Sequence, residues 1–157
     1  MAIAVVALLA AFLVPGPAPP GTRMAQSSVG GPVSIGAACT HYPRAEVSLA
    51  APGSGTIVVT ATVGVGINHT AGFSDVARIV LALSSTECTV TNHTAFVSVP
   101  ASLPTERGHF VTVPLQRAFP VSGPMTLTVY VNGVMAQGAD ASDRFDSASL
   151  VAVYYPN

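Results

Sequence analysis

The sequence predicts an all-β protein, an antiparallel β-sandwich of about eight strands, from two observations. First, alternation of apolar and polar residues with a period of two dominates the chain after residue 36. Second, Pro, Gly and other turn residues interrupt this alternation at short distances. Helical periodicity is absent apart from a turn or two near residues 140–145.

The clearest strand covers residues 56–68, TIVVTATVGVGIN. Its odd-numbered residues are all apolar, whereas its even-numbered residues are mostly Thr, Gly and Asn. This pattern predicts a long strand with one buried face, in which Gly64 and Gly66 lie on the outer face.

Seven further segments carry strand patterns, separated by turn signals. Asn132-Gly133 is typical of a two-residue hairpin with a type I′ turn, and Pro114 predicts an edge strand or a bulge. The segments are Ala45–Ala51, Val76–Ser84, Thr89–Val99, His109–Phe119, Met125–Val131, Val134–Gln137 and Ala148–Tyr155.

A sandwich of this size is either a jelly roll or immunoglobulin-like. The chain has no tryptophan, which counts against the immunoglobulin core. The final segment 147–156, SASLVAVYYP, resembles the closing strand of C1q/TNF-like jelly rolls. That resemblance implies a trimeric binding domain.

The N-terminal region predicts export. Residues Ala2–Val14 are all apolar and stop at a proline-rich segment. This run is too short for a membrane-spanning helix of about 20 residues, but it suits the core of a signal peptide. We expect a signal peptide or N-terminal anchor over residues 1–25, a Ser/Gly-rich linker over 26–36 and the sandwich domain over 37–157, in a secreted or cell-surface protein.

The two cysteines, Cys39 and Cys88, predict a disulfide in an exported chain, and the alternative is two buried thiols. A disulfide that closes a loop of about 50 residues stabilises a fold by roughly 4 kcal/mol. Neither cysteine belongs to a CxxC pair, so redox catalysis has no support.

Charge is sparse, at 8% of residues, and the net charge is −1. Nucleic acid is therefore not expected as a partner. The low charge indicates either a neutral surface rich in hydroxyl groups or a surface covered by other subunits, as in a homo-oligomer. All six basic residues are arginines, which together with abundant Ala, Val, Gly and Pro indicates GC-rich, bacterial coding.

Two sets of residues are candidate metal ligands. His69, His93 and His109 share the parity of core-facing residues and could bind copper or zinc, although they could equally be strand-end histidines. The acidic residues Asp140, Asp143 and Asp146 could bind calcium, or could form a solvated turn.

Asn68 and Asn92 each begin an Asn-His-Thr triplet, the acceptor sequence for N-glycosylation. A structural role at strand ends, through bonds from side chain to backbone, is the alternative for both.

Catalytic motifs are absent, although Ser74, Asp75 and His69 could be drawn as a triad. We therefore expect a non-enzymatic protein without a cofactor, an exported binding or structural module for an unknown extracellular ligand or protein. The loops Ala71–Asp75 and Ala139–Asp146 are the expected recognition surface. The alternatives are a histidine-based metal-binding protein and a subunit of an extracellular oligomer or surface assembly.

Overall fold

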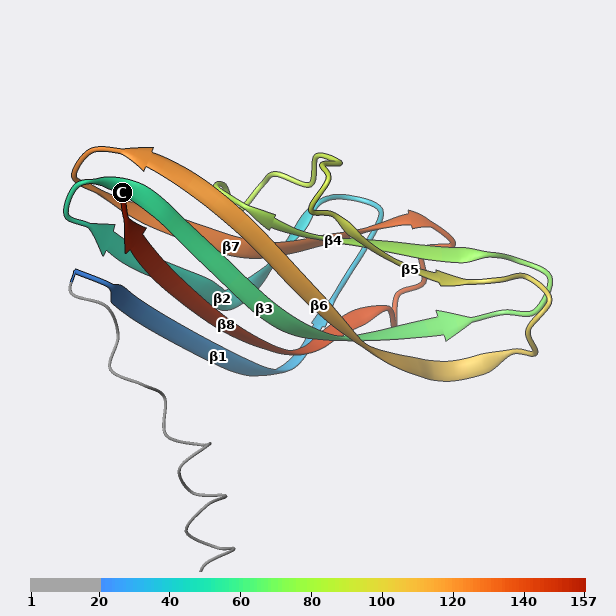
Figure 1. The fold of residues 1–157 in the computed structure, drawn as a ribbon. Coiled ribbons are helices and arrows are strands. Elements are labelled where there is room, and N and C mark those ends of the chain that lie inside the picture. Colours follow the sequence, from blue (N-terminus) through green and yellow to red (C-terminus); the bar gives the residue numbers. More distant parts are fainter. Residues whose placement is uncertain (1–20) are drawn as a thin grey trace, which may run out of the picture.

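The computed structural model describes residues 21–157, which form two four-stranded antiparallel sheets packed as a sandwich (Figure 1). The predicted all-β sandwich is therefore confirmed. None of the described residues belongs to a helix long and apolar enough to cross a membrane. The strands are β1 (Arg23–Ser34), β2 (Thr40–Ala51), β3 (Ser54–His69), β4 (Asp75–Ala82), β5 (Ala95–Val99), β6 (Glu106–Ser122), β7 (Met125–Gln137) and β8 (Arg144–Pro156).

The strand pairing is nested. One sheet has the order β1-β8-β3-β6 and the other has the order β2-β7-β4-β5. Strand β1 thus pairs with β8, β2 with β7, β3 with β6 and β4 with β5, as if one long hairpin with its tip between β4 and β5 were rolled into two layers. This is the jelly-roll arrangement and not the immunoglobulin one.

Strand β3 lies inside its sheet and pairs with β6 on one side and β8 on the other. Its alternate apolar residues from Ile57 to Ile67 are at most 1% exposed, as the alternation predicts. The rings of Tyr42 and Phe145 stack 4.9 Å apart in the same core. Strand β6 is an edge strand, which confirms the prediction from Pro114.

The predicted linker is wrong, because residues 23–34 form the edge strand β1, hydrogen-bonded to β8. Ala25, Val29 and Val33 face the core but are only partly buried. The Ser and Gly residues between them obscure the alternation of apolar and polar residues in the sequence. The signal peptide predicted over residues 1–25 lies almost wholly outside the described residues.

The predicted hairpin at Asn132-Gly133 is also wrong, because β7 runs straight through both residues. A Cβ on Gly133 would lie 2.6 Å from Cζ of Phe145, so this glycine makes room for a core ring instead of forming a turn. Asn132 is fully buried, and its Nδ2 donates hydrogen bonds to the carbonyl oxygens of Ser84 and Glu87.

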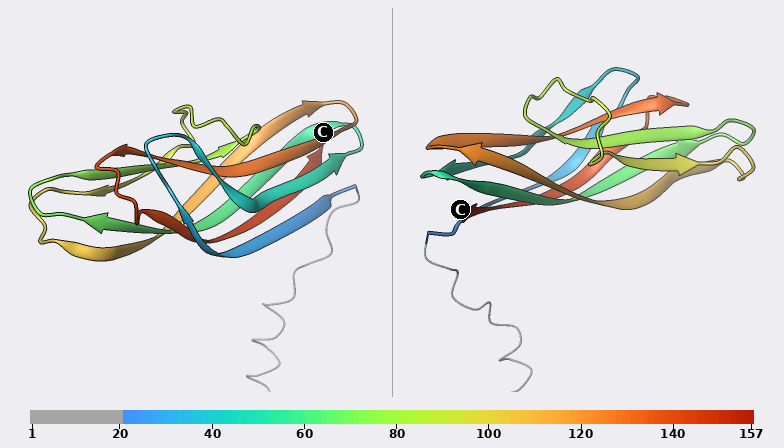
Figure 2. Two further views of the ribbon diagram at one scale, coloured as in Figure 1. Left: turned by 180° about the vertical axis from the view of Figure 1, so that it is seen from behind. Right: turned by 45° about the horizontal axis from the view of Figure 1, so that its top comes forward.

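The strand predicted over Thr89–Val99 is confirmed only for Ala95–Val99. Residues 83–94 instead form a loop that lies over the second sheet (Figure 2). The predicted disulfide is present and joins Cys88 of this loop to Cys39, which precedes β2. Beneath the loop, Val80, Ala82 and Val134 form a second small apolar cluster on the sheet's outer face.

The tight contact at Gly133 leads to a stability prediction. Gly133→Ala places a methyl group against the Phe145 ring, which is held in place by its stacking on Tyr42. We expect a loss of about 1–3 kcal/mol in the free energy of unfolding, measured by urea denaturation. Gly123→Ala is the matched control, because nothing lies within 4 Å of its Cβ position. Equal stability of the two variants would contradict this account of the core.

Candidate functional site

Three loops gather at one end of the sandwich, and two of them are the loops predicted to carry recognition. They are residues 70–74 between β3 and β4, 100–105 between β5 and β6, and 138–143 between β7 and β8. The amide of Gly72 donates to the carbonyl of Ala101 at 2.9 Å, which joins the first loop to the second. A surface hollow lined by Phe73, Asp75 and residues 138–140 joins the first loop to the third.

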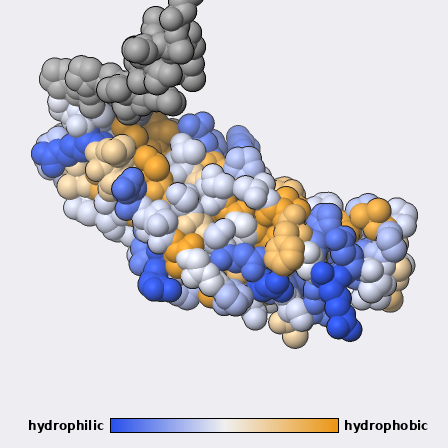
Figure 3. Space-filling view, turned by 90° about the horizontal axis from the view of Figure 1, so that it is seen from below, coloured by the Kyte–Doolittle hydropathy of each residue, from blue (hydrophilic) through white to orange (hydrophobic). Residues whose placement is uncertain are grey.

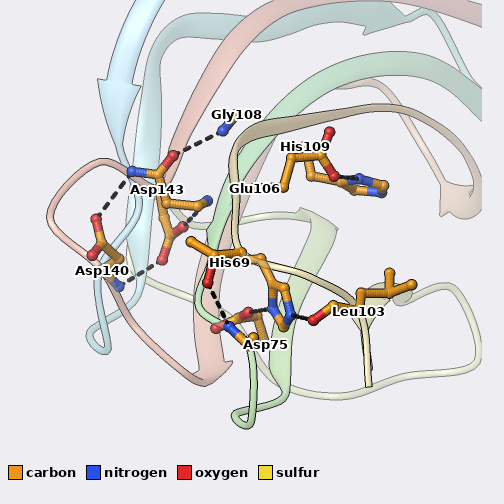
Figure 4. A network of polar contacts seen from close by, with 11 residues as sticks. His69, Asp75, Leu103, Glu106, Gly108, His109, Asp140 and Asp143 are labelled. Atoms are coloured by element: carbon orange, nitrogen blue, oxygen red, sulfur yellow. Dashed lines mark hydrogen bonds and ion pairs between the residues drawn. The ribbon is translucent and has the colours of Figure 1, made fainter. Parts of the chain in front are cut away.

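A buried histidine–carboxylate pair lies beneath these loops (Figure 4). The Nδ1 atom of His69, the last residue of β3, lies 2.6 Å from Oδ2 of Asp75, the first residue of β4. Nε2 of the same ring lies 3.2 Å from the carbonyl oxygen of Leu103 in the second loop. The two side chains are 0% and 5% exposed, so this pair ties two strands and a loop together away from water.

Both ring nitrogens of His69 face oxygen acceptors, and an imidazole satisfies two acceptors with N–H groups only when it is protonated. The hydrogen bond to Asp75 raises the pKa of His69 above its ordinary value and outweighs burial, which acts in the opposite direction. Gly138 packs against this carboxylate with a φ of 71°, where a Cβ would collide with Asp75. His69 and Asp75 therefore form an enclosed hydrogen-bonded pair, which is an ion pair when His69 is protonated.

A second polar network centres on Asp143, which is fully buried. Its Oδ1 accepts a hydrogen bond from the amide of Asn68 at 2.9 Å, and its Oδ2 accepts one from the amide of Asp140 at 2.6 Å. The Asn68 side chain in turn accepts a bond from the amide of Gly108 at the start of β6. The third loop is thereby fixed to the ends of β3 and β6.

The pKa values of the two carboxyl groups in this network are shifted in opposite directions. Burial raises the pKa of Asp143 despite its backbone hydrogen bonds. The backbone amide of Ser142, which donates to Oδ1 of Asp140 at 2.8 Å, lowers the pKa of Asp140. Asp140 is the exposed carboxylate of the pair and remains ionised at neutral pH.

Around this fixed centre, the loops present a mixed surface. A hollow of about 460 Å³ is lined by residues from 68–70, 105–107 and 140–142, including Glu106 and Arg107. Beside it the ring of Phe73 is 68% exposed, and Leu103 is also exposed. Apolar, acidic and basic groups thus lie close together above a hydrogen-bonded base.

The structure does not bring the predicted metal ligands together. His69 is buried in its ion pair, His93 is exposed in the 83–94 loop, and His109 contacts Oε2 of Glu106 at 3.1 Å with 35% of its side chain exposed. Of the acidic set, Asp140 and Asp143 share one loop, but Asp146 pairs with Arg144. Over residues 21–157, no three His, Cys, Asp or Glu side chains are grouped to hold a metal ion.

The structure also defines the contacts of the predicted glycosylation and triad residues. The Asn68 side chain is hydrogen-bonded at both its oxygen and its nitrogen, whereas Asn92 is exposed in the 83–94 loop. His69 and Asp75 do form the carboxylate–imidazole half of a triad, but Nε2 contacts the Leu103 carbonyl and not the Ser74 hydroxyl. Sequence reasoning missed Leu103 and Gly138, which act through backbone atoms and leave no side-chain signal.

Comparison with known proteins identifies no family. No protein-family model and no curated protein sequence matches the chain. Among solved structures, a mutant VP2 protein of infectious bursal disease virus in T=1 particles is 12% identical, with a TM-score of 0.38, covering 89% of this chain and 35% of that one. A subviral particle of the same viral protein is 13% identical, with a TM-score of 0.39, covering 91% and 37%. The chain spans little more than a third of these structures, and a likeness at this level has no bearing on function.

The His69–Asp75 pair gives the fold a pH dependence. The pKa of His69 is raised in the folded state. Its contribution to the free energy of unfolding is therefore complete below the ordinary histidine pKa of about 6.5 and is lost as pH rises through the raised value. We expect the free energy of unfolding to fall across this range, as measured by urea denaturation at a series of pH values.

His69→Gln should flatten this dependence, and His93→Gln, which changes an exposed histidine, should leave it unchanged. An identical slope in the two variants would show that His69 is not the group responsible.

Proposed function

We propose that this chain is an exported, non-catalytic module that acts by binding, with the loop end described above as its recognition surface. The observation that carries this proposal is the buried network of His69, Asp75 and Asp143, which ties together three loops that expose Phe73, Leu103 and Asp140. Loops held on a rigid scaffold are the usual carriers of recognition, because little conformational entropy is lost when they bind.

The chemistry of the buried groups supports a role without catalysis. A general base needs a free lone pair within reach of substrate, but both nitrogens of His69 are engaged by protein acceptors. Both oxygens of Asp143 accept backbone N–H groups, and the residue is fully buried. These side chains hold the loops in place instead of facing a ligand.

The exposed groups at this end suit a ligand that offers both apolar and charged contacts. Phe73 supplies a large apolar contact, and Glu106, Arg107 and Asp140 supply both signs of charge around the hollow. An exposed aromatic ring beside polar groups is typical of the centre of a binding surface.

Export is supported by the disulfide together with the apolar segment Ala2–Val14. Disulfides such as Cys39–Cys88 persist in oxidising compartments and are rare in a reducing cytosol. Alkylation followed by mass spectrometry of the native chain should find no free thiol until a reductant is added. Recovery of the chain in reduced form from the cytoplasm would contradict export.

The binding proposal is tested with the fluorescently labelled, disulfide-intact chain on envelope and medium fractions of the source organism. We expect saturable binding that Phe73→Ala weakens by about 10-fold or more, the loss typical of an aromatic anchor. Phe96→Ala is the matched control, because this phenylalanine is similarly exposed, on strand β5, but lines neither of the two hollows at the loop end. Equal binding by both variants, or no saturable binding by the original chain, would contradict the proposal.

A further inference from the structure

The two sheets differ in what lies on their outer faces. The outer face of β2-β7-β4-β5 is covered by the 83–94 loop, which Cys39–Cys88 and the hydrogen bonds of Asn132 hold in place. The outer face of β1-β8-β3-β6 has no such cover among the described residues. We call this second surface the bare face, formed by the outward residues of 24–30, 147–155, 56–64 and 112–120.

No charged side chain points outward from these four segments, and the Arg144–Asp146 ion pair borders them on the same sheet, beside Gly64 and Gly66. The four segments contain a single charged residue, Arg117. It is turned inward, since its Nη1 donates to the carbonyl of Leu81 in the other sheet at 2.6 Å and its guanidinium lies over the Phe119 ring. A charge-free surface across four strands is unusual, because outward strand positions are normally rich in charged residues.

The strand register arranges the bare face in rows. One row is apolar across all four strands: Met24 pairs with Val153, Val153 with Val58, and Val58 with Ala118. The neighbouring rows contain mainly Ser, Thr, Gly, Gln and Pro, apart from Val151 and Tyr155. Seen from the side of β1 and β8, pale and orange atoms lie among several strongly hydrophilic patches (Figure 3).

We propose that the bare face is an association surface on which a second copy of this chain packs about a two-fold axis. This proposal is independent of the binding role of the loop end. A face without charge offers nothing to a charged partner, but it meets an identical face without repulsion between like charges. An apolar row bordered by hydroxyl and amide groups also matches the apolar core and polar rim of interfaces between proteins.

The area of the bare face can be compared with the area that a second copy of the chain would need to bury. Four strands about 4.8 Å apart, each contributing about nine residues at about 3.3 Å, outline on the order of 550 Å² before side-chain relief is added. Stable complexes bury about 800 Å² per partner, so this outline alone amounts to roughly two thirds of such an interface. Small side chains such as Ser28, Thr62 and Gly64 leave it flat enough for two sheets to meet about 10 Å apart.

The first test measures the mass of the full chain by sedimentation equilibrium over a range of concentrations. We expect a reversible dimer whose Kd is raised about 100-fold or more by Thr60→Arg, because the two-fold axis brings like charges together. Thr126→Arg is the matched control, since Thr126 is also an exposed strand residue but lies on the covered sheet. A monomer at every soluble concentration, or a dimer that both variants leave intact, overturns the proposal.

The second test needs no variant and so does not depend on how Thr60→Arg folds. Hydroxyl-radical footprinting of the unaltered chain should show that Tyr155 loses reactivity as concentration rises, whereas Phe96 does not. The two rings start from similar exposures, 48% and 53%. The proposal is overturned if the reactivity of both rings is independent of concentration. It is also overturned if Tyr155 is already protected in the monomer, because another part of the same chain would then cover the face.

Discussion

The pairing of β3 on both sides determines most of this structure. Its backbone is bonded to β6 and β8, so it cannot shift by one residue without turning its apolar side chains outward. Burying Ile57, Val59 and Val63 therefore fixes Val58 and Thr60 on the opposite face. One alternation thus builds the core and sets the composition of the outer surface. The remaining strands add to this frame in nested pairs that end at the β4–β5 connection.

The two outer faces and the loop end divide the surface of the molecule into regions with different chemistry. The disulfide and Asn132 supply an internal cover for one sheet, so that its outward valines are buried within the same chain. The other sheet keeps an uncharged area with one apolar row, bordered by the Arg144–Asp146 ion pair. The loop end, in contrast, contains His69, Asp75, Asp140 and Asp143, whose hydrogen bonds connect the loops to the strand ends. The proposed recognition at the loop end and the proposed association on the bare face involve separate residues and do not exclude each other.

Sequence patterns predicted this fold where periodicity was strong and failed where tertiary contacts override local signals. Strand β3 was predicted to within two residues because twelve of its residues alternate. Strand β1 was missed, since an edge strand needs little apolar content when its backbone bonds to β8. Asn132-Gly133 was wrongly predicted to form a turn, because a glycine that makes room for the Phe145 ring cannot be distinguished in the sequence from a turn glycine. The predicted total of eight strands agrees with the structure only because the missed β1 offsets the division of β7. At the site, parity predicted that His69 faces the core, and its neighbour Asp75 was named as a possible triad partner, but the Leu103 carbonyl comes from a separate segment and could not be inferred.

The central claim is that one outer face is covered by the chain itself and the other is completed by a second copy. Methyl NMR spectra of the full chain in a dilution series test it residue by residue. The account predicts concentration-dependent shifts for Val58, Val151 and Val153 on the bare face and unchanged signals for Val80 and Val134 under the 83–94 loop. Spectra that do not change with concentration, or shifts confined to Val80 and Val134, would contradict it.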